Sequence, residues 1–135
     1  MTLQQPLKKG FKQMLAEANA FIETISVHDA LPLVGQKSVL FLDVREAFEL
    51  EKGEIEGALH AARGFLEFFA DPESTMHKPE MSRAEKIILY CATGGRSAFA
   101  AKMLVDMGYD FERVFNLAGG IEAWKAAGGP IEIFG

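Results

Sequence analysis

The sequence predicts an α/β fold, in which helices cover both faces of a mostly parallel sheet. Three short, mostly apolar segments, at residues 38–44, 87–90 and 114–117, suit strands that are buried on both sides, and helix-sized segments separate them. Strands separated in this way pair in parallel through right-handed crossovers, which place helices on both faces. Ligands bind outside the carboxyl ends of such strands, so a functional site is expected directly after one of these runs.

The composition is that of one globular domain, since 49% of the 135 residues are hydrophobic and 24% are charged. A net charge of -5 argues against nucleic acid as a partner. The single cysteine cannot form an internal disulfide, and three scattered histidines form no cluster of metal ligands, so we expect no metal or other cofactor. No apolar run is long enough to span a membrane, and no targeting signal is present. We therefore expect no membrane partner and a cytoplasmic location, where a thiol stays reduced.

Residues 1–20 are interpreted as an N-terminal helical extension, followed by one domain over residues 21–135. Phe11, Leu15, Ala18 and Ile22 fall at helical spacing, which predicts an amphipathic helix over about residues 7–20. We expect this helix to pack on the domain or on a second subunit, in preference to acting as an arm for another partner. Monomer and homodimer both stay open.

The other elements follow from apolar runs and from glycine, proline and capping residues. Ser26 caps a short helix that Pro32 makes irregular, and Gly108 ends the longest helix. The expected strands are residues 21–26, 38–44, 58–61, 87–90 and 114–117. The expected helices are residues 27–34, 47–52, 65–70, 97–107 and 121–127, and residues 71–82 form a loop.

The candidate site is Cys91, which directly follows the apolar run at residues 87–90. The loop and helix start after it comprise Ala92, Thr93, Gly94, Gly95, Arg96 and Ser97. Two glycines let successive N–H groups turn toward one point, which suits a thiolate. Lowering a thiol pKa by about 1.5 units takes about 2 kcal/mol, which a helix N-terminus, N–H donors and a guanidinium supply together without a histidine base.

Each site residue also has a plainer interpretation. A lone cysteine is often a small buried apolar residue, and Thr93 either presents its hydroxyl to the site or simply forms the turn. Arg96 could be a solvated side chain at a helix start, but a cation there opposes the helix dipole. We therefore favour electrostatic interaction of Arg96 with a substrate or with the thiolate.

Five motifs, in order along residues 22–130, resemble those of single-domain rhodanese-like sulfurtransferases. They are LDVRE at residues 42–46, GEIEGALH at 53–60, RG at 63–64, YCATGGRS at 90–97 and NLAGGIEAW at 116–124. The resemblance implies a three-layer fold around a five-stranded, mostly parallel sheet. Glu54 and Glu56 depart from it, because the family often has His and Pro there, but both belong to a structural turn.

The function expected from these residues and this resemblance is sulfur transfer. The thiolate of Cys91 attacks the outer sulfur of an anionic donor such as thiosulfate, forms a persulfide, and passes the sulfur to a thiol or cyanide acceptor in a ping-pong reaction. Arg63 matches an arginine of many relatives and is a possible anion-binding residue. Asp43 and Arg45 are expected to form an ion pair that supports the site.

Two other functions stay open. A persulfide carrier or sensing module, working with a sulfur-relay protein, would need the same loop. A cysteine-based phosphatase or arsenate reductase is less favoured, because the phosphatases that resemble rhodaneses have five residues between Cys and Arg, whereas Cys91 and Arg96 are separated by four. No aspartate in a recognisable acid loop is present to assist a leaving group either.

Overall fold

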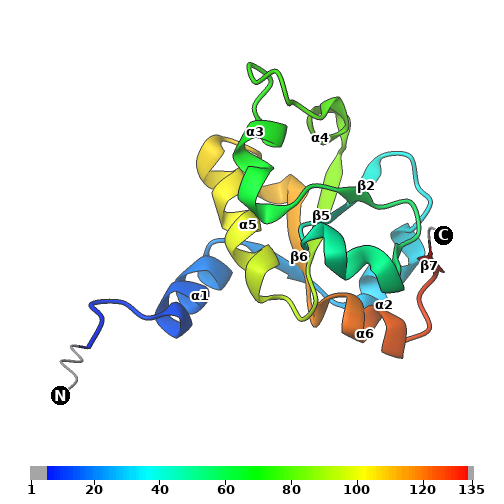
Figure 1. Cartoon of the computed structure of the whole chain (residues 1–135), viewed down its shortest axis with the longest axis horizontal. Coiled ribbons are helices and arrows are strands. Elements are labelled where there is room, and N and C mark those ends of the chain that lie inside the picture. The colour runs from blue at the N-terminus through cyan, green and yellow to red at the C-terminus, as the bar shows by residue number, and fades with distance from the viewer. Residues whose placement is uncertain (1–5, 134–135) are drawn as a thin grey trace.

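The computed structural model describes residues 6–133 and contains a five-stranded, wholly parallel sheet in the order β1-β6-β5-β2-β4 (Figure 1). Its strands are β1 (Glu23–Ile25), β2 (Val39–Asp43), β4 (Leu59–His60), β5 (Lys86–Tyr90) and β6 (Val114–Leu117). The order is not the chain order, so helical crossovers connect the neighbours. The α/β class and the five-stranded parallel sheet predicted from the sequence are confirmed.

Helices cover both faces of this sheet, as predicted. The α-helices are α1 (Phe11–Ala20), α2 (Val27–Ala30), α3 (Leu66–Ala70), α4 (Pro79–Arg83), α5 (Gly95–Met107) and α6 (Gly120–Ala126). Short 3-10 helices are η1 (Leu31–Leu33), η2 (Ala47–Lys52), η3 (Arg63–Phe65) and η4 (Phe111–Arg113). None of the helices in residues 6–133 is both long enough and apolar enough to cross a bilayer.

The core has two layers because β5 is buried on both faces. Ile87 and Leu89 join the cluster beneath α5, whereas Ile88 and Tyr90 join the cluster that contains Trp124 of α6. Successive side chains of a strand point to opposite faces, so a continuous apolar run is what this central position requires. The residue after Tyr90 therefore leaves the sheet at its carboxyl edge, in the middle of the fold.

A second, two-stranded sheet was not predicted. β3 (Glu54–Ile55) pairs antiparallel with β7 (Ile131–Glu132), near the C-terminus. Trp124 helps to hold the segment before β7 in place, because its indole N–H donates to the Pro130 carbonyl at 3.0 Å. Each of these strands has only two residues and contains a charged one, Glu54 or Glu132, so no apolar pattern marks them in the sequence.

Several predicted boundaries were wrong. The N-terminal helix begins at Phe11 and not at residue 7, because Gly10 is extended and favours a helix interior poorly. The predicted loop at residues 71–82 contains the start of α4, where Pro79 occupies the first turn, a position that proline favours. The predicted helix at 97–107 begins two residues earlier, at Gly95, because Gly94 adopts a positive φ of 113° and ends the loop there.

The N-terminal helix packs on the domain through one face. Ala18 is fully buried and Leu15 packs against the cluster beneath α5. Phe11 and Met14 stay largely exposed, at 67% and 47%. Residues 1–5 of the predicted extension and residues 134–135 of the predicted domain lie outside the described residues.

Candidate active site

Cys91 lies directly after β5, at the carboxyl edge of the sheet, and only 1% of it is exposed. The chain turns through Ala92, Thr93 and Gly94 and then enters α5, so the first N–H groups of that helix lie beside the sulfur. The loop is also held from behind by α6, since Ile121 and Glu122 donate their N–H groups to the carbonyls of Cys91 and Ala92 at 3.0 and 3.2 Å.

The thiol sulfur is surrounded by donors. The Gly94 N–H donates to Cys91 Sγ at 3.2 Å, and the Ser97 hydroxyl lies 3.4 Å from it. Burial raises the pKa of Cys91, but hydrogen bonds from the Ser97 side chain and from the N–H groups of Ser97, Gly94 and Thr93 outweigh it, so the pKa is lowered. The arrangement favours a thiolate without help from a histidine.

Ser97 links the sulfur to the buried amide of Asn116, for which the sequence predicted no role in the site. Its hydroxyl lies 2.6 Å from Asn116 Oδ1, and Asn116 Nδ2 donates to the Gly94 carbonyl at 3.1 Å. A hydroxyl has one hydrogen, so Ser97 cannot donate to Sγ and to Asn116 at the same time. Asn116 lies on β6 and is one of the few buried polar residues. The signal available in the sequence was a polar amide between Phe115 and Leu117 within a predicted buried strand.

Arg96 has a partner that the sequence did not reveal. Its guanidinium donates to both carboxylate oxygens of Glu49, at 2.7 and 2.9 Å, although 41% of the side chain is exposed. The pKa of Glu49 is lowered to about 2, and the hydrogen bond from Arg96 is the largest of the causes. Glu49 and, to a smaller extent, the Cys91 charge raise the pKa of Arg96. The contact of Arg96 that the structure shows is therefore the one with Glu49, and the charge of Cys91 adds less to its pKa.

Glu49 is fixed in place by an ion pair beneath it. Arg45 Nη2 lies 2.8 Å from Asp43 Oδ2, and both side chains are buried. The same guanidinium donates to the carbonyls of Glu49 and Gly53, at 3.1 and 2.9 Å. The structure thus brings together Asp43, Arg45 and the segment that carries Glu49, and this segment in turn contacts Arg96.

Arg63 lies apart from this network. It begins η3 after β4 and is partly exposed, and its backbone N–H donates to the Val44 carbonyl at 3.1 Å. Within residues 6–133 its guanidinium makes no hydrogen bond or ion pair. Its place at the carboxyl edge is compatible with anion binding, which stays a prediction. The described residues also contain no group of three His, Cys, Asp or Glu side chains that could hold a metal ion.

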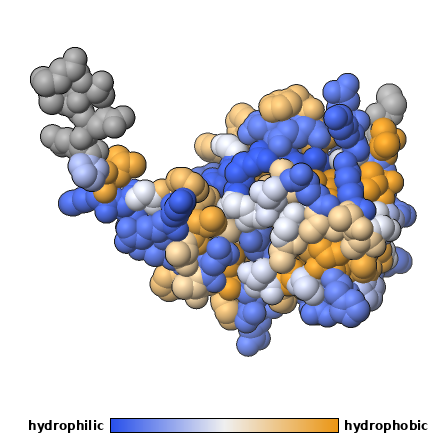
Figure 2. All heavy atoms as spheres, turned by 90° about the horizontal axis from the view of Figure 1, so that it is seen from below, coloured by the Kyte–Doolittle hydropathy of each residue, from blue (hydrophilic) through white to orange (hydrophobic). Residues whose placement is uncertain are grey.

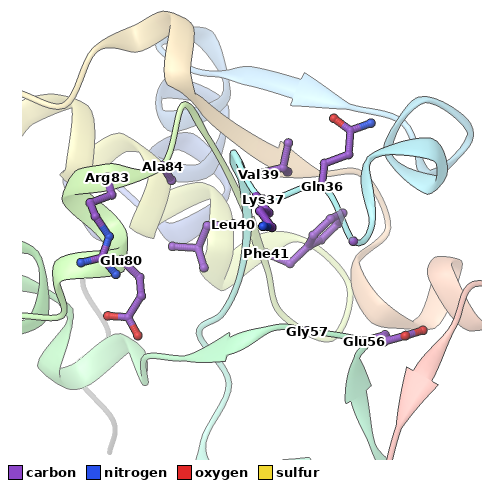
Figure 3. A pocket seen from close by; sticks show the side chains of 11 residues that line it. Gln36, Lys37, Val39, Leu40, Phe41, Glu56, Gly57, Glu80, Arg83 and Ala84 are labelled. Carbon is purple, nitrogen blue, oxygen red and sulfur yellow. The ribbon is translucent and has the colours of Figure 1, made fainter.

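Two cavities differ in their relation to Cys91. One, of about 350 Å³, lies where β2 and β5 begin, with Lys37, Arg83, Glu80 and Glu56 around it (Figure 3). It is therefore at the edge of the sheet opposite Cys91. The other, of about 590 Å³, is bordered by Thr93, Gly94, Gly95 and Arg96 of the loop and helix start after Cys91, but Cys91 itself does not line it.

Comparison with known proteins agrees with this geometry. A family model described as the rhodanese-like domain matches residues 26–127. A thiosulfate sulfurtransferase GlpE from Coxiella burnetii is 32% identical over 102 residues, which cover 76% of this chain and 86% of that protein.

Two solved structures extend the likeness to most of the chain. A protein of unknown function from Rhodopseudomonas palustris, described as a possible tyrosine phosphatase, is 43% identical with a TM-score of 0.89 and covers 97% of this chain and 100% of its own. A polysulfide-sulfur transferase homodimer from Wolinella succinogenes is 27% identical with a TM-score of 0.67, over 92% of this chain and 88% of its own.

Proposed function

We propose that this chain, which belongs to the rhodanese-like family and is a sulfurtransferase, moves a sulfane sulfur through a persulfide on Cys91. The observation that carries the proposal is the set of donors around Cys91 Sγ, which lowers the thiol pKa and so increases the share of the nucleophilic thiolate.

The first half-reaction takes sulfur from a small anionic donor such as thiosulfate. The thiolate of Cys91 attacks the outer sulfur, the S–S bond of the donor breaks, and sulfite leaves with its electron pair. The N–H groups of Thr93, Gly94 and Ser97 then stabilise the negative outer sulfur of the persulfide. Arg96 supplies positive charge near this position, and Arg63 is a second candidate to attract the anion to the edge of the sheet.

The second half-reaction restores the enzyme. A thiolate or cyanide attacks the outer sulfur, and the Cys91–sulfur bond breaks with its electrons returning to Cys91 Sγ. Asp43 and Arg45 act indirectly, by holding the segment with Glu49 that positions Arg96. A thiol that must stay reduced between cycles suits the cytoplasm, as the sequence led us to expect.

Mass spectrometry after incubation with thiosulfate tests the persulfide directly. We expect wild-type protein to gain one sulfur atom and Cys91→Ser to gain none. Thr93→Ser, which keeps the loop and its N–H groups, is the matched control and should still be labelled. Loss of labelling in Cys91→Ser alone supports the assignment, and an unlabelled wild-type protein refutes it.

The description of the Rhodopseudomonas palustris relative makes phosphatase activity the rival to test. Four residues separate Cys91 and Arg96, which leaves a small loop, and Arg96 is already bonded to Glu49. These observations favour a sulfur atom over a tetrahedral phosphate. We expect no release of phosphate from p-nitrophenyl phosphate under conditions that load Cys91 with sulfur.

A carrier for a sulfur-relay protein uses the same persulfide, so turnover is needed to distinguish it from an enzyme. Saturable multiple turnover with thiosulfate and a thiol acceptor supports the enzyme. Labelling that is slow with thiosulfate and fast with a protein persulfide donor supports the carrier instead.

A further inference from the structure

Two buried polar side chains lie beside Cys91, although polar groups are rare in the interior of this protein. Most polar and charged side chains of the described residues lie on the surface, where Figure 2 shows them as broad blue areas. The buried ones are Asp43, Arg45, Glu54, Ser97 and Asn116. Ser97 is fully buried and Asn116 is 4% exposed, so neither can exchange its protein partner for water without cost.

The orientation of the Asn116 amide is fixed by its two neighbours. The Gly94 carbonyl, 3.1 Å from Asn116 Nδ2, can only accept a hydrogen bond, so the amide N–H faces it. Oδ1 then faces Ser97 Oγ at 2.6 Å and can also only accept, so the hydrogen between them belongs to the Ser97 hydroxyl. In this direction of the hydroxyl, the Ser97 oxygen presents only lone pairs to Cys91 Sγ.

A second acceptor lies within reach of the same hydroxyl, since Cys91 Sγ is 3.4 Å from Ser97 Oγ. Rotation of the hydroxyl hydrogen exchanges one acceptor for the other, and no heavy atom has to move. A neutral thiol can donate its own hydrogen to the Ser97 oxygen, whereas a thiolate can only accept. The hydroxyl therefore suits Asn116 while Cys91 is a thiol, and suits Cys91 once the sulfur is charged.

We propose that Asn116 is a positioning residue, which holds the Ser97 hydroxyl while Cys91 is a thiol or a persulfide and releases it to the thiolate. This inference rests on the proposed function and adds a control on the same site. In the persulfide the negative charge lies on the outer sulfur, so Sγ no longer needs the hydroxyl and Asn116 accepts from it again.

The hydrogen bond between Ser97 and Asn116 makes ionisation of Cys91 more costly. When the thiol proton leaves for solvent, the hydroxyl turns to the sulfur and Asn116 Oδ1 loses its donor. Within residues 6–133, the Ser97 hydroxyl is the only donor to that oxygen. A buried acceptor without a partner is unfavourable, so Asn116 opposes the thiolate that the N–H groups of the loop favour.

Asn116→Leu tests this role, because it keeps the size of the side chain and removes the acceptor. The Gly94 carbonyl still accepts the Ala98 N–H at 3.2 Å, so it is not left unpaired. We expect the pKa of Cys91 to fall by roughly 0.5–1 unit, since the hydroxyl gives up no other bond to reach the thiolate. The ultraviolet absorbance of the thiolate measures this pKa without any sulfur donor. Loss of a purely structural support for the loop would instead raise the pKa, because the N–H donors would be held less well.

Ser97→Ala supplies the matched background, because it removes the hydroxyl for which the two acceptors compete. In that background, Asn116→Leu should change the pKa of Cys91 by no more than about 0.2 units. Asn116→Ala replaces Asn116→Leu if the larger side chain prevents folding. Wild-type protein gives an independent measurement by NMR, in which the side-chain carbonyl carbon of Asn116 should shift over the pH range where Cys91 ionises. This shift should be much smaller in Ser97→Ala.

The rate of sulfur loading gives a second readout. Below the pKa of Cys91, Asn116→Leu should form the persulfide about two- to threefold faster than wild type, because a larger thiolate share outweighs the lower nucleophilicity of a more acidic thiol. At a pH where both proteins are fully ionised, the variant should be no faster than wild type.

The outcomes separate this inference from the proposed function. A wild-type protein that gains no sulfur from thiosulfate overturns the proposed function, while the absorbance titrations still decide whether Asn116 holds the hydroxyl. The role of Asn116 is overturned if the pKa of Cys91 rises or stays constant in Asn116→Leu. It is also overturned if the pKa falls equally with and without the Ser97 hydroxyl, or if the Asn116 carbon of wild type does not respond to ionisation of Cys91.

Discussion

Glu49 and Arg96, which are 47 residues apart in the sequence, form a bidentate ion pair between η2 and the first turn of α5. Glu49 Oε2 also accepts the Glu46 N–H at 2.8 Å, so this carboxylate closes the first turn of η2 and holds the guanidinium at once. The cation that the sequence places at a helix start, where the dipole opposes it, is thus compensated by a carboxylate from another loop.

The ion pair should limit how strongly Arg96 attracts an anion. We expect Glu49→Gln to lower KM for thiosulfate by about two- to fivefold and to steepen its dependence on salt, because the guanidinium then carries uncompensated charge. Arg96→Gln should lower kcat/KM by about tenfold. Steady-state kinetics at two ionic strengths measure both effects. If the two single variants and the double variant are equally impaired, the pair acts only as a structural clamp.

The same pair predicts how stability depends on pH. The pKa of Glu49 falls from 4.5 to about 2 on folding, so its stabilising contribution is complete above pH 4.5 and is lost as the pH falls toward 2. The difference in unfolding free energy between wild type and Glu49→Gln should shrink over that range, as urea denaturation at several pH values can measure. A difference that stays constant from pH 5 to 2 contradicts this assignment.

Ser97→Ala should raise the pKa of Cys91, because the Ser97 hydroxyl is the largest of the causes that lower it. The ascending limb of the pH profile of kcat/KM should move to higher pH, and the ultraviolet absorbance of the thiolate should appear at the same higher pH. Ser97→Thr keeps a hydroxyl and is the control. An unshifted profile in Ser97→Ala would show that Ser97 donates to Asn116 in both protonation states of Cys91.

Gly120→Ala should disturb the Cys91 loop from behind. Gly120 has a φ of 60°, and an added Cβ would meet the carbonyl oxygens of Ala92 and Cys91 at 2.5 and 2.6 Å. We expect a loss of about 1–3 kcal/mol in unfolding free energy and a lower rate of persulfide formation. Gly64→Ala is the control, because nothing lies within 4 Å of its added Cβ. Unchanged labelling in Gly120→Ala would show that the loop tolerates this displacement.

Glu54→Gln should stabilise the protein. Glu54 is 7% exposed, and its Oε2 has no hydrogen-bond partner among residues 6–133. Burial, followed by the charge of Asp43, raises its pKa. Wild type therefore loses stability as the pH rises from 4.5 through the raised pKa. At pH 7 the substitution should add about 1 kcal/mol to the unfolding free energy. Glu56→Gln, at an exposed position in the same turn, should change it little, and equal effects of the two variants would contradict the explanation.

Local sequence determined much of this protein. Mostly apolar segments specify β2, β5 and β6, because strands buried on both faces admit few polar residues. The order Cys91, Gly94, Gly95 and Ser97 specifies a cysteine beside a helix N-terminus, because the glycines permit the turn and the residues after them favour a helix. These features depend on neighbours in the chain, and pattern can therefore reveal them.

The tertiary structure decided the partners. The paired strands bring Glu49 into contact with Arg96 and Asn116 into contact with Ser97. They also place α1 beside the loop that follows Cys91. The β3–β7 pair likewise joins segments that are too short to show a period of their own. Contacts between distant segments depend on sheet order and helix packing. No local sequence pattern therefore shows which carboxylate pairs with Arg96 or which residues surround the Cys91 loop.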